Sequence, residues 1–430
     1  MAPLHPTPWG LELSPAMDAL LGIVRKELVA GGAGTAGSAG TVRTAGTAGT
    51  AGEQPAADPA ALASLAARHG VEGLVLRGGG RLEGTGALTA VAGNLERIRE
   101  LHRVVGVMEA AGIPTTAMKG PALAVQAWGD VSARSYGDVD LLVPPDRARD
   151  CVAALLGAGY VDRRAAYGLE PSPAHWHDWS FTAPDARTLV EIHWSLVAPT
   201  RYPAVDSAEV WQADAREEVR LPGGTVWALA PEVQLPYLAI HATAHHWGWL
   251  EFPLTLAGLV HRSRIRSDAR GPLDWDALWD RARRWRCRRI TTVGLLLARE
   301  LAGSDTLDLP ASVRRELDGD AEAARLARWY GTMLLSEPGS GARSGAGSGA
   351  GSGAGSGTGS GTGSAWYQGS PALWWRRMRM EDWTPARLRA GWSLLFGTTT
   401  AEWEAGSAPS RVPAPLRRVT RLLRRYRGQG

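Results

Sequence analysis

The sequence predicts an α+β fold, in which a sheet with flanking helices precedes a mainly helical C-terminal domain. Between residues 90 and 200, short runs rich in β-branched and aromatic residues alternate with segments whose apolar residues recur at helical spacing. From Pro231 onward, the helical spacing dominates. The 430 residues, of which 44% are hydrophobic, allow two or three domains with a sizeable core.

Composition divides the chain into five segments. Two Gly-rich stretches of low complexity have too few apolar residues to form a core and are expected to be flexible. The expected segments are N-terminal helices over residues 1–90 with a disordered Gly/Ala/Thr-rich insert at 31–57, a sheet-containing domain over 91–228, a helical domain over 229–336, a Gly/Ser-rich linker over 337–364 and a basic helical segment over 365–430.

The helices are predicted from apolar periodicity and from residues typical of helix ends. Residues 87–111 carry the longest amphipathic pattern in the first half of the chain, which Gly112 ends, and Pro121 stands near the first turn of the next helix. The predicted helices span residues 11–30, 58–69, 87–111, 121–128, 146–157, 232–249, 274–286, 288–302 and 311–330.

Extended runs lie between several of these helices. A short run at 113–118 and an acidic-then-apolar run at 138–143 stand on either side of the helix predicted at 121–128. The runs at 179–182 and 189–196 flank a turn at Pro184 and Asp185, which predicts an antiparallel pair. A weak strand is expected after Tyr160.

Three acids are expected to meet at one edge of the sheet. Asp138 and Asp140 are two residues apart in a predicted strand, so their carboxylates leave the same face, and Glu191 lies in a second strand. Converging carboxylates repel one another unless a cation neutralises them, and hard oxygen ligands favour Mg²⁺ or Mn²⁺. We therefore predict that these three residues are catalytic metal ligands. The alternatives are a solvated turn for the aspartates and an edge-strand charge for Glu191.

A metal site with free coordination positions suits a nucleoside triphosphate such as ATP, and two ions can hold the attacking and leaving oxygens of a phosphoryl transfer. Lys119 is one of only two lysines in a chain that otherwise uses arginine. We predict that Lys119 and Gly120 bind the triphosphate, because glycine lets the backbone approach closely before a helix N-terminus. The alternative is a surface lysine in a turn.

Two further side chains are candidates for nucleotide binding. Arg134 can hold a phosphate through its planar guanidinium, or it can pair with Asp138 and steady the loop. His193 shares the strand face of Glu191, and it can line the site or be a hydrogen-bonded core histidine.

Other features favour structural roles. His241 and His245 have metal-ligand spacing on one helix, but no cysteine or third ligand clusters with them, so we expect packing instead of zinc binding. Residues 413–426 combine arginines with an apolar side, which predicts a terminal helix docked on the helical domain; contact with a membrane surface or RNA is the alternative.

Charge and cysteine content narrow the class of protein. A net charge of only +4 makes nucleic acid an unlikely partner. Cys151 and Cys287 form no CxxC motif and are typical of reduced core thiols in a cytoplasmic protein. No apolar run reaches about 18 residues, so no membrane span is expected. The Arg, Ala and Gly bias is typical of a GC-rich genome, and we expect a bacterial protein, whose oligomeric state the sequence leaves open.

Several motifs occur in order along the chain. They are Lys-Gly-x-x-Leu-Ala from Lys119, Arg-x-x-x-Asp-x-Asp-Leu-Leu-Val from Arg134, Leu-x-x-x-Gly-Tyr from Leu155, Glu-Ile-His-Trp from Glu191 and Leu-x-x-His-x-x-x-His-x-Trp from Leu238. In these motifs the chain resembles the uncharacterised nucleotidyltransferase family of the polymerase-β-like nucleotidyltransferase superfamily, over most of residues 90–430. The resemblance implies a mixed sheet flanked by helices, and a catalytic domain within residues 91–228.

The resemblance also implies transfer of a nucleoside monophosphate from a nucleoside triphosphate to an acceptor, with loss of pyrophosphate. Asp138 and Asp140 would be metal ligands and Glu191 the third carboxylate, while Lys119 and Gly120 replace the Gly-Ser or Gly-Gly phosphate turn of the wider superfamily. We expect a hydroxyl-type acceptor on a small molecule, peptide or protein. A nucleotide-sensing module without turnover and an RNA-modifying transferase are the alternatives.

Overall fold

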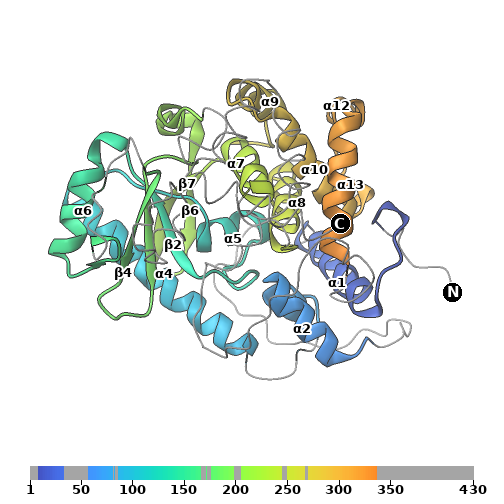
Figure 1. Ribbon diagram of the computed structural model, residues 1–430, viewed down its shortest axis with the longest axis horizontal. Helices are drawn as coiled ribbons and strands as arrows, with labels where there is room; N and C mark the ends of the chain where they lie inside the picture. Colours follow the sequence, from blue (N-terminus) through green and yellow to red (C-terminus); the bar gives the residue numbers. More distant parts are fainter. Residues whose placement is uncertain are drawn as a thin grey trace, which may run out of the picture.

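The structure is a computed structural model that describes residues 8–32, 57–80, 82, 86–165, 171, 176–197, 205–244, 249–266 and 270–336. Most of the predicted insert at 31–57 lies outside the described residues, as do the linker at 337–364, the basic segment at 365–430 and His245. In the described part, a sheet with its helices stands beside a group of packed helices (Figure 1). The predicted α+β fold class is therefore confirmed.

Seven strands form one mixed sheet in the order β3-β4-β5-β2-β1-β7-β6. They are β1 (Thr116–Ala117), β2 (Asp138–Leu142), β3 (Val161–Asp162), β4 (Asp178–Thr182), β5 (Leu189–His193), β6 (Arg216–Leu221) and β7 (Gly224–Leu229). The central pair β2 and β5 is parallel, as is β1 with β7, and the remaining neighbours are antiparallel. The antiparallel pair predicted around Pro184 is thus confirmed as β4 and β5.

Alternation along β2 separates an apolar face from a polar one. Val139 and Leu141 belong to a core that includes Leu101, Val104 and Met108 of helix α4 (Gly86–Ala110). Helix α6 (Ala148–Gly157) contacts α4 and contributes to the same core. Because successive side chains of a strand point to opposite faces, the two aspartates of β2 are left on the face away from α4.

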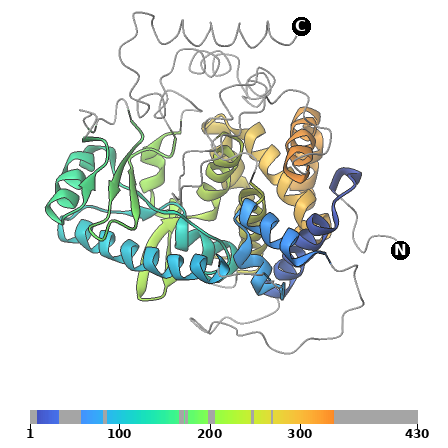
Figure 2. The ribbon, with the colours of Figure 1, turned by 60° about the horizontal axis from the view of Figure 1, so that its bottom comes forward.

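The other described helices are α1 (Pro15–Gly32), α2 (Pro59–His69), α3 (Glu72–Arg77), α5 (Gly120–Trp128), α7 (Pro231–Ala244), α8 (Glu251–Arg264), α9 (Trp275–Arg284), α10 (Arg288–Ala302), α11 (Ser304–Leu307), α12 (Ala311–Gly319) and α13 (Ala321–Leu335). Short 3-10 turns lie at Pro8–Gly10, Pro145–Arg147, Ser207–Trp211 and Ala213–Ala215. Helices α1 to α3 share one hydrophobic core with α7 to α13, although about 150 residues separate them in sequence. Figure 2 shows these N-terminal helices beside the C-terminal ones.

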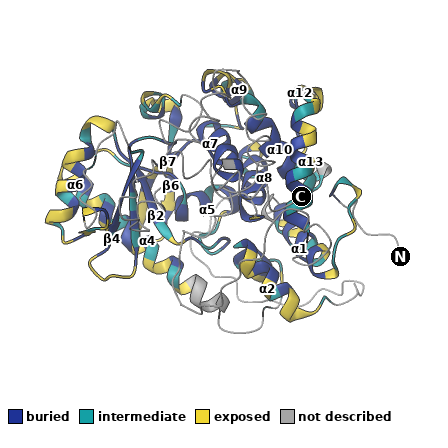
Figure 3. Ribbon diagram, in the orientation of Figure 1, coloured by how far each residue is buried: buried dark blue, intermediate teal, exposed yellow. Residues whose placement is uncertain are grey.

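Several elements differ from the expectations. The segment predicted as one helix over 311–330 is two helices, because the Asp320 side chain accepts hydrogen bonds from the amides of Glu322 and Ala323 and begins a new helix there. The hairpin of β6 and β7 and the helices α3 and α8 were not predicted. Helix α8 is buried nearly all round, as are parts of α7 and α10 (Figure 3).

Both cysteines are buried as free thiols, as their spacing predicts. Within the described ranges, no helix is both long enough and apolar enough to cross a membrane.

Candidate active site

Strand pairing brings the predicted site residues onto one face. In the parallel pair of β2 and β5, Asp140 stands opposite Glu191, and Leu142 stands opposite His193. Directly paired residues share a face, and so do residues two apart in one strand. Asp138, Asp140, Glu191 and His193 therefore project from the same side of the sheet.

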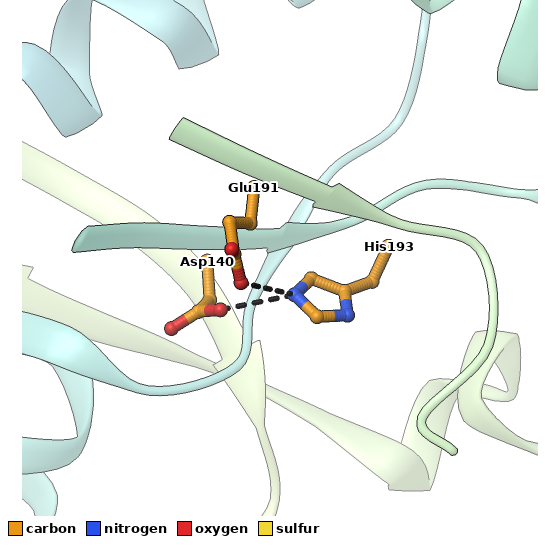
Figure 4. Close-up of side chains that lie close together, drawn as sticks. All are labelled: Asp140, Glu191 and His193. Carbon is orange, nitrogen blue, oxygen red and sulfur yellow. Dashed lines mark hydrogen bonds and ion pairs between the residues drawn. The ribbon is translucent and has the colours of Figure 1, made fainter. Parts of the chain in front are cut away.

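Three of these side chains converge closely enough to hold one cation. One ligand atom from each of Asp140, Glu191 and His193 lies within 4.8 Å of the other two. His193 Nε2 is 2.9 Å from Asp140 Oδ1 and 3.8 Å from Glu191 Oε2, so all three side chains meet at one point (Figure 4). Asp138 shares the face but does not belong to this group of three.

Lys119 reaches the same point from a tight turn at residues 118–120, called the Lys119 turn below. Its Nζ lies 3.1 Å from Asp140 Oδ2, so the two groups form a buried ion pair. Gly120 follows with φ of 58°, in the left-handed region that favours glycine, and it begins helix α5. The amide of Met118 donates to Asp140 O at 3.1 Å, so the turn is tied to β2 directly beside the acids.

The ion pair fixes the charges of Lys119 and Asp140. Burial by itself raises the pKa of the Asp140 carboxyl, but Lys119 and His193 outweigh it and hold this pKa well below its usual value. Burial by itself lowers the pKa of Lys119, but Asp140 and the other acids outweigh it and raise this pKa well above its usual value. Both groups are charged at neutral pH.

Two neighbouring acids, Glu191 and Asp138, have raised pKa values. Burial, followed by the nearby Asp140, Asp178 and Asp138, raises the pKa of Glu191 to about 8. Burial and the adjacent Asp140 raise the pKa of Asp138 to about 6. Burial is the first cause of both shifts and repulsion from nearby carboxylates is the second, and a bound divalent cation would offset that repulsion.

The available donor atoms fit a hard divalent cation. The site offers carboxylate oxygens and one imidazole nitrogen, which suit Mg²⁺ or Mn²⁺. Of the three predicted metal ligands, Asp140 and Glu191 belong to the converging group and Asp138 does not, while His193 joins it; binding of an ion by these residues stays a prediction.

Arg134 is buried and lies close to the Lys119 turn, but its partner is an acid that the sequence did not indicate. Its Nε is 2.6 Å from Glu251 Oε1, and Nη2 contacts the same oxygen. Nη1 donates to Gly120 O at 3.3 Å. The pairing with Asp138 considered from sequence is replaced by pairing with Glu251, while phosphate binding by Arg134 stays a prediction.

Strand β4 extends the polar face and was not included among the predicted site residues. Ser180 stands opposite Glu191, and its hydroxyl donates to Glu191 Oε1 at 3.5 Å. Asp178 stands opposite His193 and pairs with Arg164 at 3.1 Å. The polar residues at every second position of this strand were the sequence signal that could have identified them.

Helix α7, the first helix after the sheet, contacts the Lys119 turn. Gln234 is fully buried, and its Nε2 donates to Met118 O at 2.8 Å. Tyr237, one turn later, is also buried; burial raises its pKa, as do Asp140 and Glu191, while Lys119 acts in the opposite direction. His241 packs its ring 5.0 Å from that of Phe252.

Comparison with known proteins identifies a family. The model of the uncharacterised nucleotidyltransferase family matches residues 55–303, which is more than half of the chain and includes every predicted site residue. A comparison with curated proteins gives no significant match. The chain belongs to the uncharacterised nucleotidyltransferase family.

Proposed function

We propose that the protein is a metal-dependent nucleotidyltransferase, which moves a nucleoside monophosphate from a nucleoside triphosphate to a hydroxyl group of a small molecule, peptide or protein. The observation that carries the proposal is the convergence of Asp140, Glu191 and His193 within 4.8 Å, beside the ammonium group of Lys119. Carboxylates and a histidine on one face of the sheet, with a lysine from the adjoining turn, match the needs of phosphoryl transfer, in which positioning and charge stabilisation dominate.

Asp140 and Glu191, with Asp138 and His193 beside them, would hold Mg²⁺ or Mn²⁺. When bound, such ions neutralise phosphate charge and polarise the phosphorus–oxygen bonds, and a pair of ions would assist both the attacking and the leaving oxygen. Lys119, charged at neutral pH, would exchange part of its contact with Asp140 for the triphosphate. The N-terminus of α5, which starts at Gly120, favours anions in the same place.

In the proposed reaction the acceptor oxygen attacks the α-phosphorus. The bond from the α-phosphorus to the bridging oxygen breaks, pyrophosphate leaves, and the hydroxyl proton passes to a base. Glu191 is the proposed base. Its pKa of about 8 leaves it protonated at neutral pH in the metal-free protein, and a bound cation would lower that pKa and free the carboxylate to accept the hydroxyl proton. Ser180 would keep Glu191 oriented through the bond to Oε1.

The test is transfer of label from α-labelled nucleoside triphosphates, each incubated with Mg²⁺, the protein and a cell extract, with mass spectrometry of the product. The double substitution Asp138→Ala and Asp140→Ala should abolish transfer while circular dichroism shows a folded chain. Substituting the exposed Asp146 and Asp150 with alanine is the matched control and should leave transfer unchanged. Equal transfer by the double variant and the wild type would exclude the assignment.

A nucleotide-sensing module without turnover is the second candidate. The observation in its favour is that both oxygens of Asp140 already have cationic or hydrogen-bonding neighbours, in Lys119 and His193, at 3.1 and 2.9 Å. Calorimetry that shows nucleotide binding, together with no release of pyrophosphate under any acceptor condition, would favour this candidate over transfer.

A further inference from the structure

We propose that the helical domain positions the Lys119 turn through two buried side chains, Gln234 of α7 and Glu251 of α8. Both are inferred to be positioning residues for phosphate binding, and the assignment of phosphate to the turn rests on the proposed function. Within the described ranges, neither residue forms a hydrogen bond or ion pair with the group formed by Asp140, Glu191 and His193.

Gln234 holds the carbonyl on the N-terminal side of Lys119. Its Nε2 donates to Met118 O at 2.8 Å, while the Met118 amide donates to Asp140 O at 3.1 Å. Met118 is therefore fixed between β2 and α7. Gln234 is fully buried, and burying an amide costs free energy that an apolar side chain would not. The hydrogen bond to Met118 O gives a reason for a polar residue at this position.

Glu251 acts on the other side of Lys119, through Arg134. The carboxylate holds two nitrogens of the guanidinium, and the remaining Nη1 donates to Gly120 O at 3.3 Å. The peptide after Gly120 leads into Pro121 and has no N–H, so this carbonyl is its only polar group. Arg134 and Glu251 are each about 95% buried at the side chain, which keeps the pair from exchanging with water.

The anchor for this arrangement is rigid. A Cβ at Gly258 of α8 would stand 2.7 Å from Ala127 O of α5, so the backbones of the two helices pack closely against each other. Helix α8 thus holds α5 from one side and, through Glu251 and Arg134, the turn at which α5 begins. With the carbonyls of Met118 and Gly120 both fixed, neither can rotate toward an anionic phosphate, and the Lys119 side chain starts from a fixed point.

The experiment compares Gln234→Leu and Glu251→Gln with Glu232→Gln in the full-length protein. Glu232 is a buried acid of α7 that accepts from the amide of Asp274 and pairs with Arg270, away from the turn. The readouts are the KM for Mg²⁺-nucleotide, kcat, and hydrogen exchange of the backbone amides in residues 118–123. The first two variants should raise KM roughly tenfold with kcat near the wild-type value, and should speed exchange in 118–123.

A purely structural role predicts a different pattern. If the two variants lower thermal stability to the same extent as Glu232→Gln, and leave both KM and the exchange of residues 118–123 unchanged, the inference is overturned. If the wild type transfers no nucleotide to any acceptor, the proposed function fails, yet the exchange measurement still decides whether Gln234 and Glu251 order the turn. Failure of the positioning inference and failure of the proposed function are therefore separate results.

Discussion

Replacing Glu191 with glutamine removes a carboxyl group whose pKa is raised from 4.5 to about 8 by burial and by the nearby acids Asp140, Asp178 and Asp138. A carboxyl with a raised pKa in the folded state stabilises the fold while it is protonated. That contribution is complete below about pH 4.5 and is lost as the pH rises through 8. The metal-free wild type should therefore lose stability over this window, and Glu191→Gln should not.

The size of the effect follows from the shift. Each pKa unit corresponds to about 1.4 kcal/mol, so the rise from 4.5 to about 8 would amount to about 5 kcal/mol at full ionisation and slightly less at pH 8. The neighbouring acids also titrate, so they share the repulsion and reduce the part that Glu191 alone accounts for. We therefore expect the free energy of unfolding of Glu191→Gln to exceed that of the wild type by about 2–4 kcal/mol at pH 8 and by almost nothing at about pH 4.5.

The assay is urea unfolding in EDTA across pH 5 to 8.5, repeated with Mg²⁺ in millimolar excess. Mg²⁺ should raise the free energy of unfolding of the wild type at pH 8, because it binds the folded state, and should have little effect on Glu191→Gln. Glu218→Gln, which alters an exposed carboxyl of β6, is the control and should follow the wild type. Parallel pH profiles for wild type and Glu191→Gln, with equal gains from Mg²⁺, would refute the reasoning.

Three further predictions concern the ion pair and the packing. Asp140→Asn leaves the Lys119 ammonium buried without its carboxylate, so the free energy of unfolding, measured with urea, should fall by about 3 kcal/mol. An unchanged free energy of unfolding would contradict the buried pair. Lys119→Met removes the cation that competes for Asp140, so electron paramagnetic resonance should show tighter Mn²⁺ binding without nucleotide, whereas calorimetry should show weaker binding of Mg²⁺-nucleotide. Tighter binding of Mg²⁺-nucleotide as well as of Mn²⁺ would contradict a role of Lys119 in phosphate binding. Gly73→Ala places a Cβ 1.9 Å from Ser132 O and should cost about 2 kcal/mol or more in thermal or urea unfolding, whereas Gly106→Ala, in open space on α4, should be neutral or slightly stabilising.

Much of the site was accessible from sequence because its geometry follows from local rules. Alternation in a strand places Asp138 and Asp140 on one face, and the same rule places His193 with Glu191. Their register across β2 and β5 is not local, but apolar residues such as Val139 and Leu141 must face the core, which leaves one orientation for the acids. The amphipathic pattern of α4 and the turn before α5 were likewise readable residue by residue.

The parts that sequence did not reveal depend on contacts between distant segments. Glu251 pairs with Arg134 across 117 residues, and no spacing rule connects them. Helix α8 is buried on nearly all sides, so it lacks the one-sided apolar stripe by which a helix is recognised. The burial of β6 does alternate residue by residue, but a hairpin that joins the sheet through a parallel pair of β7 with β1 has no local signature.

The most direct test of the account is a titration of the metal-free protein with Mn²⁺, followed by electron paramagnetic resonance. We predict Mn²⁺ binding by the wild type that strengthens between pH 6.5 and 8.5 as Glu191 loses its proton, and that is weakened at least roughly tenfold in Glu191→Gln, as expected when a charged ligand of a hard cation is lost. Identical binding by both proteins, or no binding by the wild type at millimolar Mn²⁺, would contradict a cation site at Asp140, Glu191 and His193.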